Sequence, residues 1–321
     1  MKRIEITDGT AEKAFSKTYD CFIVGIGNES RIDFVLKQLI DKEVKIAKVL
    51  ALYYSNVHDQ RKGLVSEQLK KFPKGSVVEE TVESDGEQKV YELLRNNLPQ
   101  EGMVSILIDY SSMSRVWYAA IILWFRESRS LQPFLTFIYS AGKYTEEIAK
   151  KEVVIRDIRT VPGGEGEAYK HSRTACILGL GFYGYMSLCV CEQMEPDIIY
   201  TILTPENPVE GFDIANQEGN KELITRAANC FRVPLLSVES AYRCMMDIAT
   251  QHLAENDEVT IVPMGPKPHV LAAILAALAD RRICTLRVKH DDYGEDIRPS
   301  GTIVSTEVKF IELVTPEKQT D

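Results

Sequence analysis

The chain has 321 residues, of which 45% are hydrophobic and 26% charged, which is typical of a globular protein long enough for two domains. The formal net charge of -9 provides no overall basic field, so the composition does not favour binding of long nucleic acids. No apolar run reaches the length of a membrane span, and the polar N-terminal stretch does not predict a signal peptide.

The seven cysteines are scattered through apolar segments rather than arranged in a motif. An odd number at irregular spacing predicts reduced core thiols and a cytoplasmic protein. No group of cysteines and histidines has the spacing of a zinc site, so we expect no metal, and no motif calls for a cofactor.

Strands and helices alternate along the first half of the chain. The predicted strands are residues 19–27, 48–54, 76–82, 103–110 and 133–140. The predicted helices between them are residues 30–40, 59–72, 85–98 and 116–129. This alternation is typical of parallel strands joined by right-handed crossovers.

The second half repeats the pattern in the same order. Its predicted strands are residues 174–181, 197–204, 233–239, 258–264 and 283–289. Its predicted helices are residues 182–194, 220–231, 241–253 and 270–282. The Gly-x-Gly turn at Gly25 recurs at Gly179, 154 residues later, and each half ends in a closing strand of alternating residues, 150–158 and 301–313.

We therefore predict an α/β protein of two tandem Rossmann-like, doubly wound and mostly parallel sheets that are related by internal duplication. Residues 1–160 are expected to form the first domain and residues 173–321 the second. Residues 161–172, rich in glycine and charge, are expected to form a linker or a hairpin tip.

The turns after the first and fourth strands of each half are the candidate site, because ligands of open α/β sheets bind outside the carboxyl ends of the strands. These turns read GIGNESR (25–31), DYSSMSR (109–115), GLGFYGY (179–185) and MGPKPH (264–269). The candidate ligand-binding residues are Gly25, Gly27, Ser30, Arg31, Asp109, Ser111, Ser112, Ser114, Arg115, Gly179, Gly181, Tyr183, Gly265, Lys267 and His269.

Two of these turns carry cations at helix starts. Hydroxyls, backbone N–H groups and Arg115 suit a phosphate or carboxylate, although a Ser114 N-cap beside a solvated arginine is an alternative. Pro266 and Pro268 hold Lys267 on a rigid turn where the helix dipole disfavours a cation. The lysine is explained if it faces an anion, and a rigid turn with the lysine in water is the alternative.

Classical NAD binding is not favoured. The GLGFYG segment fits Gly-x-Gly-x-x-Gly, but Thr204 stands at the end of the second strand where an acidic residue is usual. Tyr183 either stacks on a base or packs in the core. His290 next to Asp291 and Asp292 forms either a metal cluster or a set of solvated loop charges.

With this order of elements and these turns, the sequence resembles the CARF domains (CRISPR-associated Rossmann folds), which sense nucleotides. That family carries a ligand loop after the first strand and a polar loop ending in Lys or Arg after the fourth, and DYSSMSR and PMGPKPH resemble the second loop. CARF domains pair about a two-fold axis and bind cyclic oligoadenylate across the seam, so the resemblance implies that the tandem halves supply both sides of one site. The family's glycine pair is absent, with Ser112 and Met113 in one half and Pro266 in the other, so the ligand need not be symmetric.

The resemblance implies a nucleotide-ligand sensor or regulatory subunit of a prokaryotic antiviral defence system. It would bind a small anionic or nucleotide ligand and act with a separate effector protein, because no effector domain follows the last predicted strand. An enzyme acting on a nucleotide or phosphorylated substrate, such as a ring-opening nuclease, is the first alternative, and its candidate groups are Asp109, Ser111, Lys267 and His269. A structural scaffold is the second alternative, and the sequence leaves open both enzymatic activity and a homo-oligomer.

Overall fold

The first half of the chain supplies most of a seven-stranded sheet. The computed structural model describes residues 2–143, 154–181, 183–204, 217–290 and 297–312. The strands of this sheet, in chain order, are β1 (Lys2–Thr10), β2 (Tyr19–Ile26), β3 (Ile46–Tyr53), β4 (Val77–Thr81), β5 (Gly102–Asp109), β6 (Leu131–Gly142) and β13 (Pro299–Glu312). The helices are α1 (Ala11–Phe15), α2 (Arg31–Asp41), α3 (Asp59–Leu69), α4 (Glu87–Asn97) and α5 (Arg115–Glu127).

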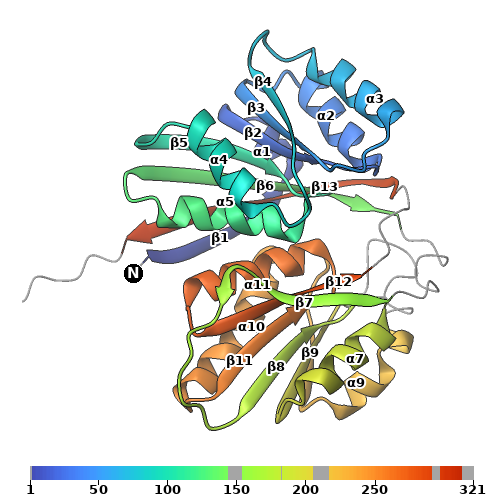
Figure 1. Cartoon of the computed structure of the whole chain (residues 1–321), viewed down its shortest axis with the longest axis vertical. Coiled ribbons are helices and arrows are strands. Elements are labelled where there is room, and N and C mark those ends of the chain that lie inside the picture. Colours follow the sequence, from blue (N-terminus) through green and yellow to red (C-terminus); the bar gives the residue numbers. More distant parts are fainter. Residues whose placement is uncertain (1, 144–153, 182, 205–216, 291–296, 313–321) are drawn as a thin grey trace, which may run out of the picture.

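The second half supplies most of a six-stranded sheet, which lies below the first in Figure 1. Its strands are β7 (Ile155–Glu165), β8 (Thr174–Gly179), β9 (Ile198–Leu203), β10 (Asn229–Arg232), β11 (Glu258–Pro263) and β12 (Ile283–His290). Its helices are α7 (Gly184–Met194), α9 (Lys221–Arg226), α10 (Val238–Ala254) and α11 (Lys267–Ala279).

The five parallel strands of each half are arranged in the same way. Their order is β6-β5-β2-β3-β4 in the first sheet and β12-β11-β8-β9-β10 in the second. In each half the first strand therefore lies beside the fourth, where the winding of the sheet reverses. The predicted α/β class with two mostly parallel Rossmann-like sheets is confirmed, and the shared order agrees with internal duplication.

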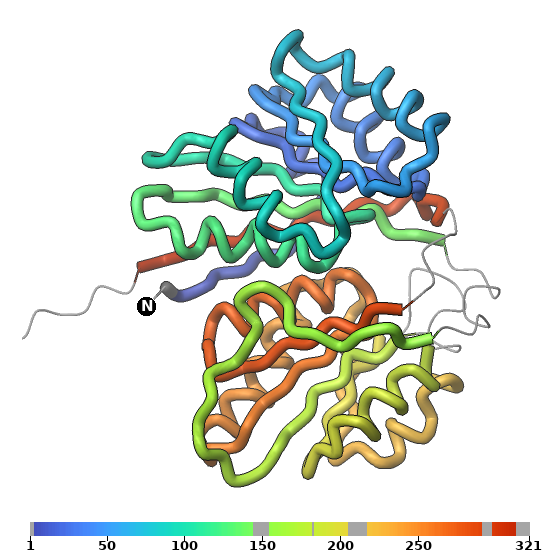
Figure 2. The backbone as a smooth tube through the Cα atoms, in the orientation of Figure 1, coloured from blue at the N-terminus to red at the C-terminus, as the bar shows by residue number. Residues whose placement is uncertain are grey.

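The closing strands are exchanged between the two sheets. Strand β7 follows the first half in sequence but pairs antiparallel with β12 of the second sheet, and β13, at the end of the second half, pairs antiparallel with β6 of the first. The backbone tube in Figure 2 shows the red C-terminal strand lying in the upper sheet. The predicted boundary at residues 161–172 separates the two halves in sequence, but each sheet contains one closing strand from the other side of that boundary. Strand β7 also extends into the predicted linker as far as Glu165.

The helices form layers on both faces of each sheet. Buried residues of α2 and α3 form one core on the outer face of the first sheet, and those of α7 and α9 form another on the outer face of the second. The layer between the sheets, built from α4, α5, α10 and α11, forms a single core to which both halves contribute. The two halves are therefore packed as one body.

Helix α5 lies at the centre of this shared core. Trp117 is fully buried, its ring stacks on Tyr54 with centroids 4.3 Å apart, and its Nε1 donates to the carbonyl oxygen of Glu83 at 2.7 Å. Replacing Trp117 by alanine is expected to lower the free energy of unfolding by about 3–5 kcal/mol, measured by urea denaturation. Trp117→Phe keeps an aromatic ring but leaves the Glu83 carbonyl without this donor, so a loss of about 1–3 kcal/mol is expected. A loss below about 1 kcal/mol for the alanine variant would contradict the close packing of Trp117 in this core.

Several element predictions differ from the structure. Strand β1 and helix α1 were not predicted, although the sequence KRIEIT alternates as a strand does. The third strand of the second half is β10 at residues 229–232, not 233–239 as predicted, and the predicted helix at 220–231 ends at Arg226. Pro234 has no N–H to donate to a ladder, and Ser237 accepts from the backbone N–H of Ser240 to cap α10, so the segment cannot continue as a strand.

No disulfide joins the cysteines among the described residues, of which Cys21, Cys176 and Cys191 are buried and the other four half-buried. No helix among the described residues is long and apolar enough to cross a membrane. Asp291 and Asp292, which follow His290, lie outside the described residues.

Candidate functional site

The carboxyl ends of the two sheets face each other across a seam between the halves. Two adjoining cavities lie there, of about 270 and 520 Å³, and residues of both halves line each of them. The residues that line both cavities are Glu29, Arg115, Tyr183, Lys267, Val288, His290 and Ile297. The seam therefore brings together the turns that follow the first and fourth strands of both halves, as the resemblance to CARF domains implies.

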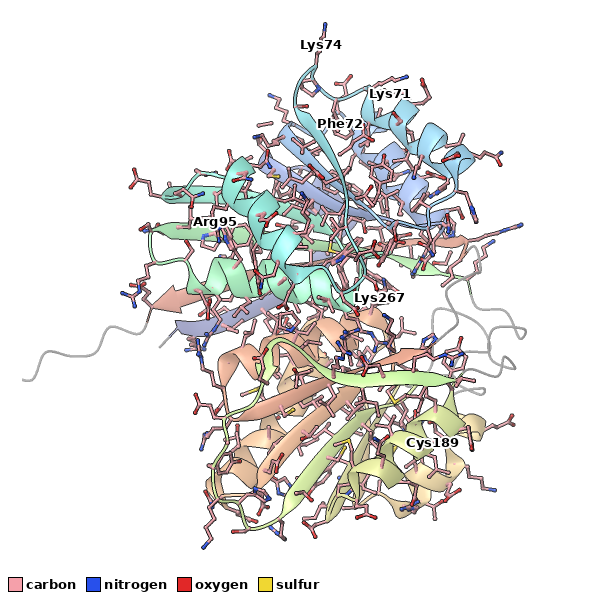
Figure 3. The ribbon with its side chains drawn as sticks, in the orientation of Figure 1. Lys71, Phe72, Lys74, Arg95, Cys189 and Lys267 are labelled. Atoms are coloured by element: carbon pink, nitrogen blue, oxygen red, sulfur yellow. The ribbon has the colours of Figure 1, made fainter. Side chains whose placement is uncertain are left out.

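Lys267 joins the two fourth-strand turns. It is the first residue of α11 in the second half, and its Nζ donates to the carbonyl oxygens of Tyr110 at 3.3 Å and Met113 at 2.9 Å in the first half. Figure 3 labels it at the boundary between the two sheets. The negatively polarised atoms that Lys267 faces are thus two carbonyl oxygens of the opposite half. Pro266 and Pro268 flank Lys267 and hold its turn rigid.

The ammonium group of Lys267 is easily deprotonated. Its pKa is lowered to about 7, chiefly by burial and in smaller part by the nearby Arg31 and Arg115, while Glu29 and Asp109 act in the opposite direction. The side chain remains partly exposed to the cavities, so water that reaches it moderates this effect. A cation whose charge depends on pH near neutrality thus lines both cavities.

Arg31 was predicted to bind ligand, and the structure shows how its donors are used. Its Nε and Nη2 bind the Glu29 carboxylate, Nη1 donates to the Tyr139 hydroxyl and the Ser140 carbonyl, both at 3.2 Å, and Nη2 also donates to the Ser111 carbonyl at 2.9 Å. Burial opposes its charge, but Glu29 outweighs burial and raises the pKa. Arg31 therefore holds the first-strand turn against β6 and contributes a wall to the smaller cavity.

Asp109 and Ser111 are fully buried beneath the DYSSMSR turn. The Ser111 backbone N–H donates to Asp109 Oδ1 at 2.9 Å, and Ser111 Oγ accepts from the Ser140 N–H at 2.8 Å. Asp109 Oδ2 has no partner among the described residues, and burial raises the pKa of this carboxyl to about 6. Both side chains shape the turn and do not line either cavity.

The remaining polar residues of this turn do reach the larger cavity. Ser112 and Ser114 line it together with Arg115. Ser114 caps α5 by accepting from the Val116 N–H at 3.3 Å, and its hydroxyl donates to the Ser84 carbonyl at 2.7 Å. Ser114 can therefore cap the helix and still line the cavity, so the two interpretations do not exclude each other.

The glycines of the turns allow close backbone packing. A Cβ on Gly181 would lie 2.3 Å from the Met264 carbonyl oxygen, and a Cβ on Gly265 would lie 2.8 Å from that of Leu180, so the two second-half turns touch through bare backbone. Gly181, Gly265 and Tyr183 line the smaller cavity, and Gly27 lines the larger one.

Other predicted residues lie outside the cavities. Gly25 and Gly179 pack against Met113 and Pro263 respectively, and Ser30 stands at the N-cap of α2 without a side-chain cap bond. His269 is 1% exposed, its Nε2 lies 3.0 Å from the Pro234 carbonyl oxygen, and burial lowers its pKa to about 4. It is therefore neutral and packs in the interior of the second half.

Charged residues that the sequence did not single out also line the larger cavity, among them Glu83 of the first half. Arg287 and Lys289 lie on β12, and Asp85 lies in the loop between β4 and α4. The two cations are two residues apart on one strand, so the alternation of side chains places them on the same face, and this spacing was the available signal. Arg287 and Lys289 join Arg115 and Lys267 as the cations of this cavity, which the carboxylates of Glu29, Glu83 and Asp85 also line.

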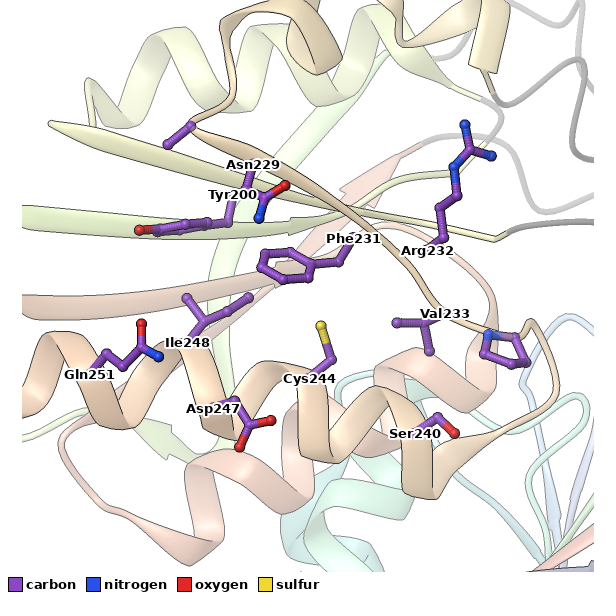
Figure 4. Close-up of a pocket in the computed structure, with 12 residues that line it drawn as sticks. Tyr200, Asn229, Phe231, Arg232, Val233, Ser240, Cys244, Asp247, Ile248 and Gln251 are labelled. Carbon is purple, nitrogen blue, oxygen red and sulfur yellow. The ribbon is translucent and has the colours of Figure 1, made fainter.

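A larger cavity, of about 810 Å³, lies elsewhere in the second half. Figure 4 shows Tyr200 and Phe231 on the sheet side and Cys244 and Ile248 on α10. None of the candidate residues in the four turns lines it. It lies between the edge strand β10 and helix α10, and not at the switch point of the sheet. Size alone therefore does not make it the candidate site.

His252, Glu255 and Asp257 approach one another closely enough to suggest a metal site. Their polar atoms already have partners, since His252 Nδ1 lies 2.8 Å from Asp257 and Nε2 lies 3.0 Å from the Tyr200 hydroxyl. Arg173 binds Asp257 at 2.9 Å and Glu255 at 2.6 Å. This group is an ion-pair network that holds the end of α10 beside β9.

No family model and no curated protein matches the chain. Among solved structures, the chain is similar to one described as a Type III CRISPR defence DNA nuclease activated by cyclic oligoadenylate, with a TM-score of 0.50 and 7% sequence identity. The match covers 80% of this chain and 63% of the nuclease chain. A likeness at this identity concerns the fold, and at that level it confirms the resemblance that the sequence shows to CRISPR-associated Rossmann folds.

Proposed function

We propose that the chain binds a phosphorylated nucleotide in the seam between its halves and acts as a sensor or regulatory subunit of an antiviral defence system. The observation that carries this proposal is the pair of cavities at the switch points of both sheets, with Arg115, Lys267, Arg287 and Lys289 on the walls. Ligands of open α/β sheets bind at this position, and cations there suit phosphate oxygens. The solved structure with the same fold belongs to a nuclease activated by cyclic oligoadenylate, which makes this nucleotide the first ligand to test.

The two halves offer different groups to such a ligand. The first helical residue after the fourth strand is Arg115 in the first half and Lys267 in the second. Lys267 reaches across to the Met113 carbonyl, whereas the DYSSMSR turn contains no lysine that could make the same contact from the first half. This asymmetry favours a ligand that is itself asymmetric or that is bound asymmetrically.

A separate effector protein completes the proposal. The chain spans 63% of the nuclease that shares its fold, and the nuclease's activity belongs to that protein. We propose that occupancy of the seam is transmitted to a partner, because the described helices that contact the seam, α5 and α11, lie in the core shared by the halves.

Binding can be tested by following the melting temperature of the purified chain against cyclic and linear oligoadenylates, NAD and nucleotide sugars. A ligand at 100 times its dissociation constant is expected to stabilise the wild type by about 2.7 kcal/mol. Arg115→Ala and Lys267→Ala should lose this shift, whereas Lys74→Ala, an exposed lysine remote from the seam, should keep it. Chromatography of the same samples separates a sensor, which returns the ligand intact, from an enzyme, which converts it. If no ligand shifts the wild type, the scaffold alternative replaces this proposal.

A further inference from the structure

Asp85 is held between two cations of the opposite half. Its Oδ1 lies 3.1 Å from Arg287 Nη1 and its Oδ2 lies 3.3 Å from Lys289 Nζ, so each carboxylate oxygen serves one cation. Asp85 belongs to the first half, both cations lie on β12 of the second half, and all three residues line the 520 Å³ cavity. A carboxylate of one half thus stands between two cations of the other at the cavity wall.

The loop that carries Asp85 is attached to the polar turn of the candidate site. Ser114 Oγ donates to the Ser84 carbonyl and Trp117 Nε1 donates to the Glu83 carbonyl, both at 2.7 Å. Both donors belong to the start of α5, directly after the DYSSMSR turn. A displacement of residues 83–86 would therefore be felt at Ser114 and along α5.

The two cations are incompletely balanced by Asp85. The side chain of Arg287 is only 12% exposed, and its Nε is shielded from solvent without an acceptor among the described residues. Burial acts to raise the pKa of Asp85, but Arg287 and Lys289 outweigh burial and hold the pKa below its usual range, so the carboxyl is ionised. One negative charge shared by two cations leaves positive charge at this part of the wall, and Glu29 and Glu83 elsewhere on the same cavity offset the charge of the cavity as a whole only in part.

We propose that Arg287 and Lys289 form a subsite for a phosphate or phosphodiester group, and that Asp85 occupies this subsite as an internal competitor. The inference rests on the proposed function of the seam and adds the group that the ligand must displace. A phosphate offers three or four oxygens where the carboxylate offers two, so it can bind both cations and also reach the buried Nε of Arg287. Ligand entry then releases Asp85 and frees the 83–86 loop, which is the moving part.

The test measures affinity by calorimetry with two probes, cyclic tetraadenylate and inorganic tripolyphosphate. Asp85→Asn keeps the shape of the side chain and removes its charge, so we expect both probes to bind at least tenfold more tightly than to the wild type. Asp85→Asn combined with Arg287→Gln should lose this gain. Glu80→Gln is the matched control, because Glu80 pairs at 3.6 Å with Lys89, away from the cavity.

The outcomes separate this inference from the proposed function. If the wild type binds cyclic tetraadenylate and Asp85→Asn binds it no more tightly, Asp85 is only an ion pair between the halves, and the inference fails while the function stands. If tripolyphosphate binds Asp85→Asn but no nucleotide binds the wild type, the subsite stands and the nucleotide function fails. If neither probe binds any variant, both fail. If Asp85→Asn does not fold, the Arg287→Gln variant alone decides. The subsite then requires this variant to bind the ligand of the wild type at least tenfold more weakly than the wild type does.

Discussion

The affinity of the seam for an anionic nucleotide is expected to fall by up to tenfold per pH unit above pH 7. Lys267, whose pKa is about 7, must be protonated to bind a phosphate as a cation. Above pH 7, each further pH unit lowers the fraction of molecules with a protonated Lys267 by a factor of up to ten. Titrations by calorimetry between pH 6 and pH 9, at constant ionic strength, measure this slope.

Two substitutions at Lys267 make the assignment specific. Lys267→Arg keeps its charge throughout this range, so its pH profile should be flat. Lys267→Met should bind about 10- to 100-fold more weakly than the wild type at pH 6, where a charge-assisted contact of about 1.5–3 kcal/mol is lost, and should also show no slope. A slope that persists in the arginine variant would assign the titration to another group.

The same pKa has a consequence for stability. The pKa of Lys267 is lower in the folded chain than the value of about 10.4 in an unfolded chain, so between these values the unfolded state binds more protons. Stability relative to Lys267→Met should therefore rise as the pH increases from 7 to 10. The full shift corresponds to about 4–5 kcal/mol, and water in the cavities reduces the expected gain to about 2 kcal/mol.

Removal of residues 299–321 is expected to unfold the first half of the chain, although β6, the strand of that half beside which β13 lies, ends 157 residues earlier at Gly142. Strand β13 pairs with β6 on one side and with β1 on the other, and Val308 is completely buried between them. Its loss leaves β1 without its partner in the described sheet, and leaves the backbone groups of β6 that paired with β13 without partners. We expect no cooperative transition for this half in urea, followed by tryptophan fluorescence, because both tryptophans lie on α5.

Fragment complementation provides the control. Residues 1–166 and 167–321, produced together, should reassemble because each fragment carries the closing strand or the pairing edge that the other needs. Residues 1–166 alone should not fold, since β6 then has no β13 and β7 has no β12. A stable, cooperatively unfolding 1–166 fragment would show that the exchange contributes little.

Much of the architecture could be predicted from alternation alone. The repeated order of strands and helices identified both sheets, and the switch-point rule located the seam at the correct turns. The exchange of β7 and β13 could not be predicted, because both segments alternate in the same way and either would fit either edge. Tertiary packing across the shared core determines which sheet each closing strand joins, and the local sequence pattern of a strand carries no information about that packing.

The residues of the site divide along similar lines. Lys267 and Arg115 were identified because their place in the turns is unusual, and both line the cavities. His269 lies two residues from Lys267, but the first turn of α11 directs it into the interior, where burial keeps it neutral. Asp85 was read only as the start of a helix, since its partners on β12 lie about 200 residues away and only the folded chain brings them together.

The exchanged strands also set the order in which the protein can form during its synthesis. The edge of β6 is complete once Gly142 has left the ribosome, but its neighbour β13 begins only at Pro299, 157 residues later. At about 5–20 residues per second, this edge waits for about 8–30 seconds without its partner. A nascent chain with an open strand edge is prone to pair with other chains, so this fold is one whose yield should depend on chaperones and on the rate of translation.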